Sequence, residues 1–355
     1  MSAVIVGGGP AGAAAAIRLA RAGVPHLLIE RTRETGDAVC GGFLSWRTLE
    51  SLATLGIDAD ALNPVRLDRV RIFAGARVVE APLPAPGLAV SRRRLDQVLL
   101  DHARAAGAAI ERGVTVRSIQ DRSVRTADGA VLTPATLFLA SGKHDIRGLA
   151  RPAEARGRDP TMGLRLRLPA GQGLTRQTGD AVELHLFPGG YVGVAVQEDG
   201  HFNLCLAVHR SAMQAAGGPT ALVRALGDAF PRLGDRLTCW DGHTPEAIAN
   251  VPYGWRARDS CAGVFRLGDQ AGVIPSLAGE GMGIAIASGI AAARAHIAGV
   301  SAPAWQRGFA RDLARPIAAA GLLRHLAESR HAARAAMMFH PVLIRISAKL
   351  TRIGQ

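Results

Sequence analysis

A glycine-rich turn follows the first apolar segment of the chain. Residues 3–6 (Ala-Val-Ile-Val) predict a buried strand, and Gly7, Gly8, Gly9, Pro10, Ala11 and Gly12 come directly after it. Glycines in this pattern permit a tight turn, a close approach of the backbone to a pyrophosphate, and close packing of the next helix. A helix predicted over residues 13–22 points its N-terminal N–H groups at that anion. The pattern therefore predicts a dinucleotide-binding strand-turn-helix unit.

An acidic residue closes the next apolar run. Residues 26–29 predict a second strand, and Glu30 follows it about 20 residues beyond the glycines, where a carboxylate accepts hydrogen bonds from the adenosine ribose hydroxyls. Arg31 comes next and is assigned to the same site. Because the glycines, the helix and the acid occur in order, the pattern is more specific than glycine spacing alone.

Length and composition exclude several classes of protein. The 355 residues, 48% of them hydrophobic, predict one large or two interleaved domains. The four cysteines form no Cys-x-x-Cys pair and no metal-type spacing with histidine, so we expect no disulfide framework, no metal site and a reducing compartment. The chain has no signal-peptide pattern and no apolar run of the ~20 residues that a membrane span needs. We therefore expect a cytoplasmic location.

The net charge of +13 comes almost entirely from arginine, since Lys143 and Lys349 are the two lysines of the chain. The arginines are spread along the whole sequence, and two tyrosines and four tryptophans offer few rings for base stacking. We therefore expect no nucleic-acid partner. A basic surface instead favours anionic cofactors, acidic carrier proteins or acidic lipids.

The order of predicted elements indicates an α/β fold with two units. Residues 136–140 and 263–267 predict strands that return to the dinucleotide-binding sheet, whereas residues 161–251 predict a second sheet, interrupted by a helix at 219–229. We expect a Rossmann-like cofactor-binding domain interleaved with a smaller β-sheet substrate domain, plus C-terminal helices. The expected boundaries are 1–64, 91–160 and 252–300 for the first domain, 65–90 and 161–251 for the sheet domain, and 301–355 for the C-terminal helical region.

A second glycine-rich element lies far along the chain. It reads Gly268-Asp269-Gln270-Ala271-Gly272, followed by Pro275 and by Gly279-Glu280-Gly281. Together with the N-terminal turn it resembles the FAD-dependent oxidoreductases that share the p-hydroxybenzoate hydroxylase fold, which include aromatic monooxygenases, flavin halogenases and geranylgeranyl reductases. The resemblance spans residues 1–300.

The resemblance implies FAD as the cofactor and gives roles to particular residues. Asp269 would bond the ribityl chain, and Arg92 would contact the FAD. The helix that starts at Gly281 and Met282 would hold the flavin edge where negative charge develops on reduction. The implied FAD contacts are Gly7, Gly9, Pro10, Ala11, Gly12, Glu30, Arg31, Arg92, Gly268, Asp269, Gly279, Gly281 and Met282.

One segment departs from the family pattern. Where many monooxygenases carry Ala-Asp-Gly followed by Ser and Arg, this chain reads Ala140-Ser141-Gly142-Lys143. Because this acid is missing, we assign no residues to a nicotinamide cofactor. NADPH or NADH is kept as a candidate reductant. The halogenases match less well because their Trp-x-Trp-x-Ile-Pro element is absent from the sequence. The segments at 40–45 and 186–191 resemble the geranylgeranyl reductase branch.

Three residues are candidates for catalysis. Cys40 precedes two glycines that allow its backbone close to a flavin ring, although a small packed cysteine fits the same pattern. His144 and Asp145 would form a proton relay, or would be loop residues pairing with Arg147. Tyr191 would donate a hydrogen bond to the substrate, or pack within the sheet.

The C-terminal segment predicts basic amphipathic helices from residue 322 onward. Such a helix lies on an anionic membrane surface and receives a lipidic substrate, or packs its apolar stripe on its own domain. Peripheral membrane contact is therefore one alternative for this region. The basic positions are Arg324, Arg330, Arg334, Arg345, Lys349 and Arg352, opposite the apolar Leu343, Ile346, Leu350 and Ile353.

These observations predict an FAD-dependent oxidoreductase that acts on a hydrophobic biosynthetic intermediate. The first hypothesis is a monooxygenase that hydroxylates an aromatic or polyketide-type molecule through a flavin C4a-hydroperoxide, because residues 268–275 resemble monooxygenases. The second is an alkene reductase like the geranylgeranyl reductases, and the third is a flavin-binding protein without turnover. The cofactor is argued from residues, whereas the reaction type is argued from the analogy of fold.

Overall fold

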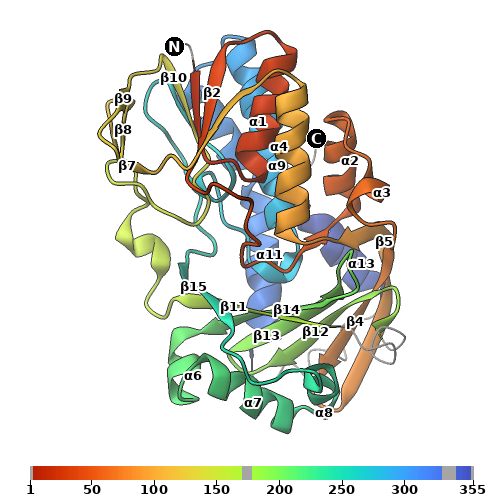
Figure 1. Cartoon of the computed structure of the whole chain (residues 1–355). Helices are drawn as coiled ribbons and strands as arrows, with labels where there is room; N and C mark the ends of the chain where they lie inside the picture. The colour runs from red at the N-terminus through yellow and green to blue at the C-terminus, as the bar shows by residue number, and fades with distance from the viewer. Residues whose placement is uncertain (1–2, 170–177, 330–340, 353–355) are drawn as a thin grey trace.

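A computed structural model describes residues 3–169, 178–329 and 341–352 of the chain (Figure 1). Five strands form a parallel sheet in which residues 136–139 pair with the N-terminal strand and residues 264–266 pair with residues 137–139, which confirms the predicted return of the chain. In that order they are β16 (Val264–Arg266), β10 (Thr136–Leu139), β1 (Ala3–Val6), β2 (His26–Glu30) and β6 (Ala109–Arg112).

The parallel sheet is covered on both faces, which explains why its strands are continuously apolar. All four residues of β1 are buried. Ala3 and Ile5 pack with α1 (Pro10–Arg21) and α9 (Gly281–Ile297). Val4 and Val6 face a small three-stranded sheet on the other side. That sheet consists of β7 (Val116–Gln120), β8 (Ser123–Thr126) and β9 (Val131–Leu132), of which β7 was not predicted.

The second sheet has eight strands and is antiparallel except where β12 pairs in parallel with β4. Its middle strands are almost continuously buried, as expected of a sheet that is covered on both faces. The strands in order are β15 (Glu246–Val251), β11 (Thr161–Leu168), β14 (Phe202–His209), β13 (Gly190–Val196), β12 (Ala181–Phe187), β4 (Leu67–Ala74), β5 (Arg77–Ala89) and β3 (Phe43–Leu44).

Helices cover the second sheet from below and one face of the first sheet (Figure 1). Two of these helices begin at serine caps, Ser45 and Ser91, whose side chains accept hydrogen bonds from the N–H groups of Thr48 and Arg94. The helices are α2 (Trp46–Thr54), α3 (Ala59–Leu62) and α4 (Arg92–Ala105) beside the first sheet, and α6 (Arg210–Ala215), α7 (Pro219–Ala229) and α8 (Pro231–Gly234) below the second.

A buried carboxylate joins the second sheet to the helices below it. Glu183 on β12 is fully buried, and its two oxygens accept hydrogen bonds from Arg236 at 2.9 Å each. Arg71 on β4 donates a third hydrogen bond at 3.0 Å. The opposite charges compensate for the loss of water around these groups. The cluster therefore links three segments that are distant in sequence.

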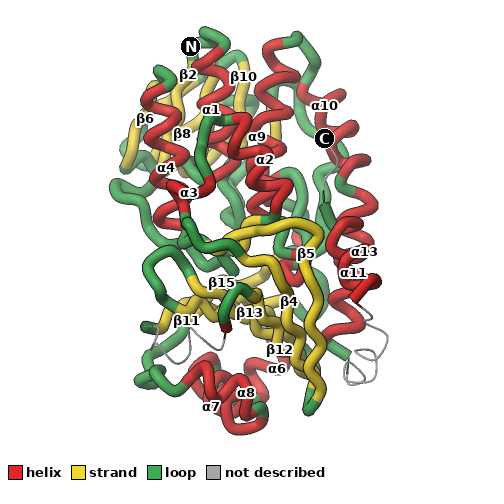
Figure 2. Tube along the Cα trace, turned by 90° about the vertical axis from the view of Figure 1, so that its right-hand side faces the viewer, coloured by secondary structure: helices red, strands yellow, loops and turns green. Residues whose placement is uncertain are grey.

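Three C-terminal helices run along one edge of the molecule (Figure 2). They are α10 (Ala302–Asp312), α11 (Ala314–Ala327) and α13 (Pro341–Leu350). Within the described ranges no helix combines the length and the apolar character that a bilayer crossing needs.

The predicted polar face of these helices is wrong at two positions. Arg324 does not face solvent but pairs with Glu328 at 2.6 Å, and the side chain of Arg352 is 6% exposed and pairs with Glu280 at 3.1 Å. A guanidinium that leaves water requires such a partner. Leu343 lies in α13. Three of the predicted positions, Arg330, Arg334 and Ile353, are outside the described residues.

Candidate active site

A cavity of about 1230 Å³ runs from the C-terminal ends of β1 and β2 to the inner face of the second sheet. One part is lined by the glycine-rich turn, Glu30 and Asp269, and the other by aliphatic side chains. Ligands of open parallel sheets bind at the C-terminal ends of the strands, so the first part is where the fold places a dinucleotide.

The N-terminal turn is shaped for close contact with a ligand. Gly7 has φ +108°, and a Cβ atom there would lie 2.4 Å from the carbonyl oxygen of Ala140. A Cβ on Gly12 would lie 1.9 Å from the carbonyl oxygen of Gly7. By contrast, a Cβ on Gly9 would meet only Arg92, at 3.5 Å. No side chain caps the N-terminus of α1, which begins at Pro10, so its N–H groups remain available to a pyrophosphate.

Glu30 is oriented by hydrogen bonds from its own neighbourhood. One carboxylate oxygen accepts from the N–H of Gly8 at 2.7 Å, and the other accepts from the N–H and the hydroxyl of Thr32, each at 2.9 Å. A carboxylate has further lone pairs, which ribose hydroxyls can use. A buried nitrogen of Arg112, Nη2, lines the cavity nearby and has no hydrogen-bond partner among the described residues.

Arg92 supplies a fixed positive charge beside the turn. Two of its nitrogens donate to Asp96 one helical turn later, at 2.9 and 2.6 Å. Burial disfavours the charge of Arg92, but the attraction of Asp96 outweighs that effect and raises the pKa of Arg92. The guanidinium is therefore held rigidly where the phosphates of a dinucleotide would lie.

Asp269 pairs with Lys143, a residue that the sequence analysis did not assign to the site. The ammonium nitrogen of Lys143 lies 3.3 Å from the Asp269 carboxylate, and Asp269 raises the pKa of Lys143. Both residues line the cavity. The signal was present in the sequence, because Lys143 is one of two lysines in an arginine-rich chain and follows the Ser141-Gly142 departure from the family pattern.

The N-terminus of α9 also borders the cavity. No side chain caps this helix, and a Cβ added to Gly281 would meet nothing within 4 Å. Gly279 has φ +65° and packs against Phe43, and Met282 lines the cavity. The free N–H groups and the helix dipole favour a negatively charged flavin edge at this point. Gly268 also lines the cavity, so all 13 predicted FAD contacts are cavity residues except Gly12, which positions α1.

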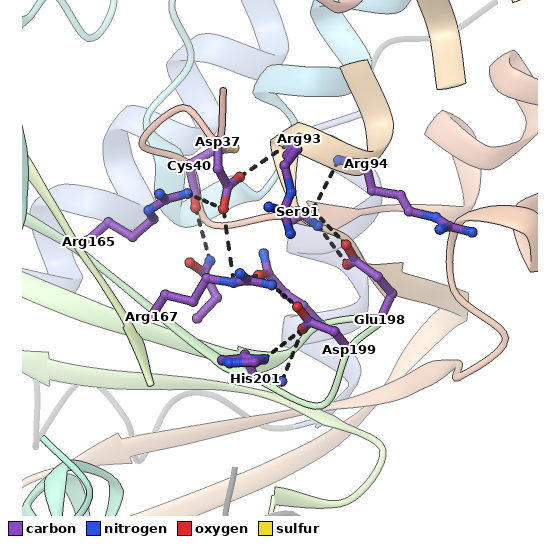
Figure 3. A network of polar contacts seen from close by, with 12 residues as sticks. Asp37, Cys40, Ser91, Arg93, Arg94, Arg165, Arg167, Glu198, Asp199 and His201 are labelled. Atoms are coloured by element: carbon purple, nitrogen blue, oxygen red, sulfur yellow. Dashed lines mark hydrogen bonds and ion pairs between the residues drawn. The ribbon is translucent and has the colours of Figure 1, made fainter. Parts of the chain in front are cut away.

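Cys40 lines the same cavity and is held by a polar network (Figure 3). Its carbonyl oxygen accepts a hydrogen bond from Asn203 at 3.0 Å. In the same loop, Asp37 accepts from the N–H of Arg93 at 3.2 Å and pairs with Arg165 at 3.0 Å. The loop is thereby tied to α4 and to the second sheet, which fixes the position of the cysteine.

The predicted relay between His144 and Asp145 is wrong as a pair. His144 Nε2 lies 2.9 Å from Arg31 Nη2, and burial lowers the pKa of His144. Asp145 pairs instead with the buried Arg151 at 2.8 Å, and not with Arg147 as the alternative prediction proposed. Because Arg151 is 8% exposed and needs an anion, it occupies the carboxylate.

Tyr191 also lines the cavity, and the sequence analysis missed two residues that meet it there. Its hydroxyl and that of Tyr253 both contact the hydroxyl of Ser276. Burial raises the pKa of both phenols. The remainder of this part is aliphatic, and its lining includes Val70, Ile72, Leu83, Val182, Leu184, Leu186, Leu206, Leu277, Leu323, Ala327 and Ile344.

The open helix start at Pro10, the carboxylate of Glu30 and the acid Asp269 form a dinucleotide-binding site that continues into a second chamber with a mostly aliphatic lining. A family model described as an FAD binding domain matches residues 1–134. The chain has the fold of the FAD-dependent oxidoreductases of the p-hydroxybenzoate hydroxylase type. The groups around the turn and the two open helix N-termini fit FAD as the cofactor.

Comparisons with known proteins agree on this fold. Menaquinone reductase of Mycolicibacterium smegmatis is 31% identical over 156 residues, which cover 41% of this chain and 38% of that reductase. A flavoprotein/dehydrogenase from Cytophaga hutchinsonii superposes with a TM-score of 0.81 at 16% identity, covering 99% of this chain and 92% of the other. A geranylgeranyl bacteriochlorophyll reductase-like protein from Thermoplasma acidophilum superposes with a TM-score of 0.73 at 19% identity, covering 99% and 93%.

Proposed function

We propose that this protein is an FAD-dependent reductase that hydrogenates a carbon–carbon double bond in a long aliphatic, isoprenoid-type molecule. The observation that carries the proposal is the continuity of the flavin site with an aliphatic chamber in one cavity of about 1230 Å³. Similarity to a menaquinone reductase and to a geranylgeranyl reductase-like protein supports the same class. Reduction was the second hypothesis from the sequence, and the shape of the chamber favours it over hydroxylation.

The chamber favours a flexible chain over a flat ring. Each buried methylene of a ligand contributes about 0.8 kcal/mol, and aliphatic walls gain this contribution from any apolar chain. Aromatic ligands gain in addition from stacking on aromatic side chains. The aromatic lining residues are Phe43, Tyr191 and Tyr253, and the guanidinium of Arg324 lies 4.8 Å over the ring of Tyr253. A polyprenyl chain therefore fits this lining better than an aromatic polycycle.

The chain's own groups fit the needs of such a reduction. Bound FAD supplies a hydride, and one alkene carbon must receive a proton as the other receives the hydride. We assign the proton to the thiol of Cys40, which the network around Asp37 holds in the cavity lining. Lys143 and the open N-terminus of α9 place positive charge where the reduced flavin carries negative charge.

The test is an oxygen-free mixing experiment. The FAD-loaded protein is reduced chemically and mixed with a panel of polyprenyl alkenes, while flavin absorbance and product mass are followed. Return of oxidised flavin without oxygen, with a product heavier by two hydrogen atoms, is expected. If every alkene leaves the flavin reduced until oxygen is admitted, and the product then carries an added oxygen atom, the reductase proposal fails and hydroxylation is correct.

Matched cysteine variants test the proton donor. Cys40→Ser should slow oxygen-free reoxidation by the alkene by about a hundredfold, because general acid catalysis contributes about that factor. Cys239 is exposed, so Cys239→Ser serves as the control and should react at the wild-type rate. An equal rate in both variants assigns the proton to another group.

Hydroxylation remains the second candidate because of one observation. The hydroxyls of Tyr191, Tyr253 and Ser276 in the chamber would orient a phenolic oxygen as well as a carbonyl. The third hypothesis, a flavin-binding protein without turnover, predicted a pocket too small for a ligand, and the aliphatic chamber that continues from the cofactor part of the cavity argues against it.

We also propose that α11 and α13 contact an anionic membrane from which the substrate enters. The inner face of each helix lines the cavity, through Leu323 and Ile344. The outer faces expose Leu322 (63%) and Leu350 (59%). Exposed Arg345 and Lys349 lie on α13. An apolar face with basic neighbours binds to anionic lipid surfaces, so these observations support a lipid-facing entrance.

A further inference from the structure

The two tyrosines of the chain meet at a single serine. Tyr191 lies on β13, Tyr253 follows β15, and Ser276 begins a short helical turn before α9. Both phenolic oxygens contact the hydroxyl oxygen of Ser276, across 85 and 23 residues of sequence. All three residues line the cavity. Three separate segments thus bring their hydroxyls to one point.

The cluster keeps hydrogen-bonding capacity for a ligand. Burial raises the pKa of Tyr191 and Tyr253, so both phenols carry their protons at neutral pH. Each hydroxyl has one proton to donate, and the two contacts at Ser276 use two of the three protons. One O–H donor therefore remains, and the described residues provide no other partner for it. Either tyrosine, or Ser276 itself, is free to donate to a ligand oxygen.

The surroundings of the cluster are mostly apolar, and the guanidinium of Arg324, which lies 4.8 Å over the ring of Tyr253, is already paired with Glu328 at 2.6 Å. Tyr191 belongs to a buried group with Ala207, Ala327 and Ile344, and Tyr253 and Leu277 pack against that group. Apart from His144, the basic side chains that line the cavity are Arg31, Arg92, Arg112, Lys143 and Arg352. The first four belong to the cofactor part. Arg352 is occupied by Glu280 and by the carbonyl oxygen of Ala278, at 3.1 and 2.7 Å.

We propose that Tyr191, Tyr253 and Ser276 bind the single uncharged oxygen, a carbonyl or a hydroxyl, at the head of an otherwise aliphatic substrate. The proposal rests on the reductase function above and specifies its substrate class as a ketone-, quinone- or alcohol-headed polyprenyl molecule. A diphosphate head is excluded because burial of its charge requires free cations, and the cluster offers neutral donors. Ser276 lies five residues before Gly281, so the cluster marks the boundary between chamber and flavin site.

The test uses three synthetic ligands with one polyprenyl tail, carrying a methyl ketone, a hydrocarbon or a diphosphate head. Each is titrated into the oxidised FAD-loaded protein, and Kd is read from the change in flavin absorbance, so no turnover is needed. The ketone is expected to bind about tenfold more tightly than the hydrocarbon, the effect of one hydrogen bond to a buried group. A triple variant, Tyr191→Phe, Tyr253→Phe and Ser276→Ala, should bind both with the hydrocarbon's Kd.

Two controls keep the result interpretable. Leu184→Ala, in the aliphatic lining, should weaken the ketone and the hydrocarbon by the same factor. If the triple variant fails to hold FAD, Tyr191→Phe, Tyr253→Phe and Ser276→Cys are combined instead, since a thiol of similar size is a weak donor and all three hydroxyls are still removed.

The outcomes separate the two proposals. If the triple variant still prefers the ketone tenfold, the hydroxyl subsite is overturned. Tighter binding of the diphosphate than of the ketone to the wild-type protein overturns it as well. Loss of the preference in the variant supports the subsite even if no alkene ever reoxidises the flavin, in which case only the reductase function fails.

Discussion

Arg352, in the last described turn of the chain, lies 3.1 Å from the carboxylate of Glu280 at the start of α9. Ser45 donates a hydrogen bond to the same carboxylate at 2.9 Å. Glu280 is 2% exposed, and this burial raises its pKa from 4.5 to about 7 against the attraction of Arg352. The contact therefore joins the C-terminal end to the flavin-facing helix through a carboxyl group that titrates near neutral pH.

The stability of the protein should therefore depend on pH through Glu280. A folded-state pKa above the unfolded value means that the folded state binds the extra proton, so this contribution is complete below pH 4.5 and is lost as the pH rises through about 7. The difference amounts to about 3 kcal/mol across that window. In urea denaturation, the free energy of unfolding of the wild type should fall between pH 5 and pH 8. The Glu280→Gln variant should lose less over the same interval. Equal losses in variant and wild type contradict the assignment.

Glu183 should behave in the opposite way. Burial raises its pKa, but hydrogen bonds from His185 and Arg236 outweigh that effect and lower it to about 2. Its contribution is therefore present above pH 4.5 and lost as the pH falls through about 2. Glu183→Ala removes the carboxylate that pairs with the buried Arg236, and one of the two that pair with Arg71, and should lower the free energy of unfolding by about 3–5 kcal/mol at pH 7.

An exposed pair provides the control for Glu183. Glu50 pairs with Arg47 at 2.9 Å, with side chains 52% and 48% exposed. Glu50→Ala should change the free energy of unfolding by less than about 1 kcal/mol, because water screens exposed ion pairs. A similar loss in both variants in urea denaturation at pH 7 means that the buried cluster has no special role.

Asp269→Ala should reduce FAD binding. The residue follows β16 in the turn Gly268–Gln270, lines the cavity and pairs with Lys143, so its loss removes a charged acceptor and leaves the Lys143 ammonium group without this carboxylate. A weakening of about ten- to a hundredfold in the Kd of FAD is expected from the loss of one charged hydrogen bond. Fluorescence titration of the apoprotein measures it. Asp259→Ala, whose side chain is 68% exposed in the wild type, should match the wild-type Kd; FAD binding by Asp269→Ala at that same Kd rules out the cofactor role.

Charge substitutions on the outer C-terminal faces should release the protein from lipid. The double variant Leu322→Glu/Leu350→Glu should cosediment with anionic vesicles at least tenfold less than wild type, because each glutamate replaces an apolar contact and repels anionic headgroups. Val131→Glu, at a position 48% exposed on β9, is the matched control. Unchanged cosedimentation of the double variant excludes this surface as the contact.

Local and periodic signals in the sequence were sufficient for the first sheet. The strand, glycine turn and acid from Ala3 to Glu30 follow rules that operate within one βαβ unit, and the apolar strands at 136–140 and 263–267 have no other place to bury both faces. The short β3 and β7 were not predicted because edge strands of a few residues leave almost no periodic signal.

The polar contacts in the chamber could not be predicted from the sequence, because they join residues from distant segments. The sequence analysis selected Tyr191, but its partners Tyr253 and Ser276 come from two other segments that meet only in the fold. For the same reason it paired Asp145 with a neighbour in sequence, whereas the buried Arg151 competed for it. Lys143 stood out in the sequence as one of two lysines, but its role in the site became apparent only from its ion pair with Asp269 in the fold.

The parallel pairing of β4 with β12 has a consequence for assembly. Residues 67–74 can pair with residues 181–187 only after the latter have been synthesised. Strand β16, which completes the first sheet, is synthesised later still. Such distant pairings are slow to form and leave strand edges open in the meantime. Neither half of the molecule is a continuous stretch of chain, so neither can be cut out as an independent piece. During synthesis on the ribosome, the two sheets must mature together.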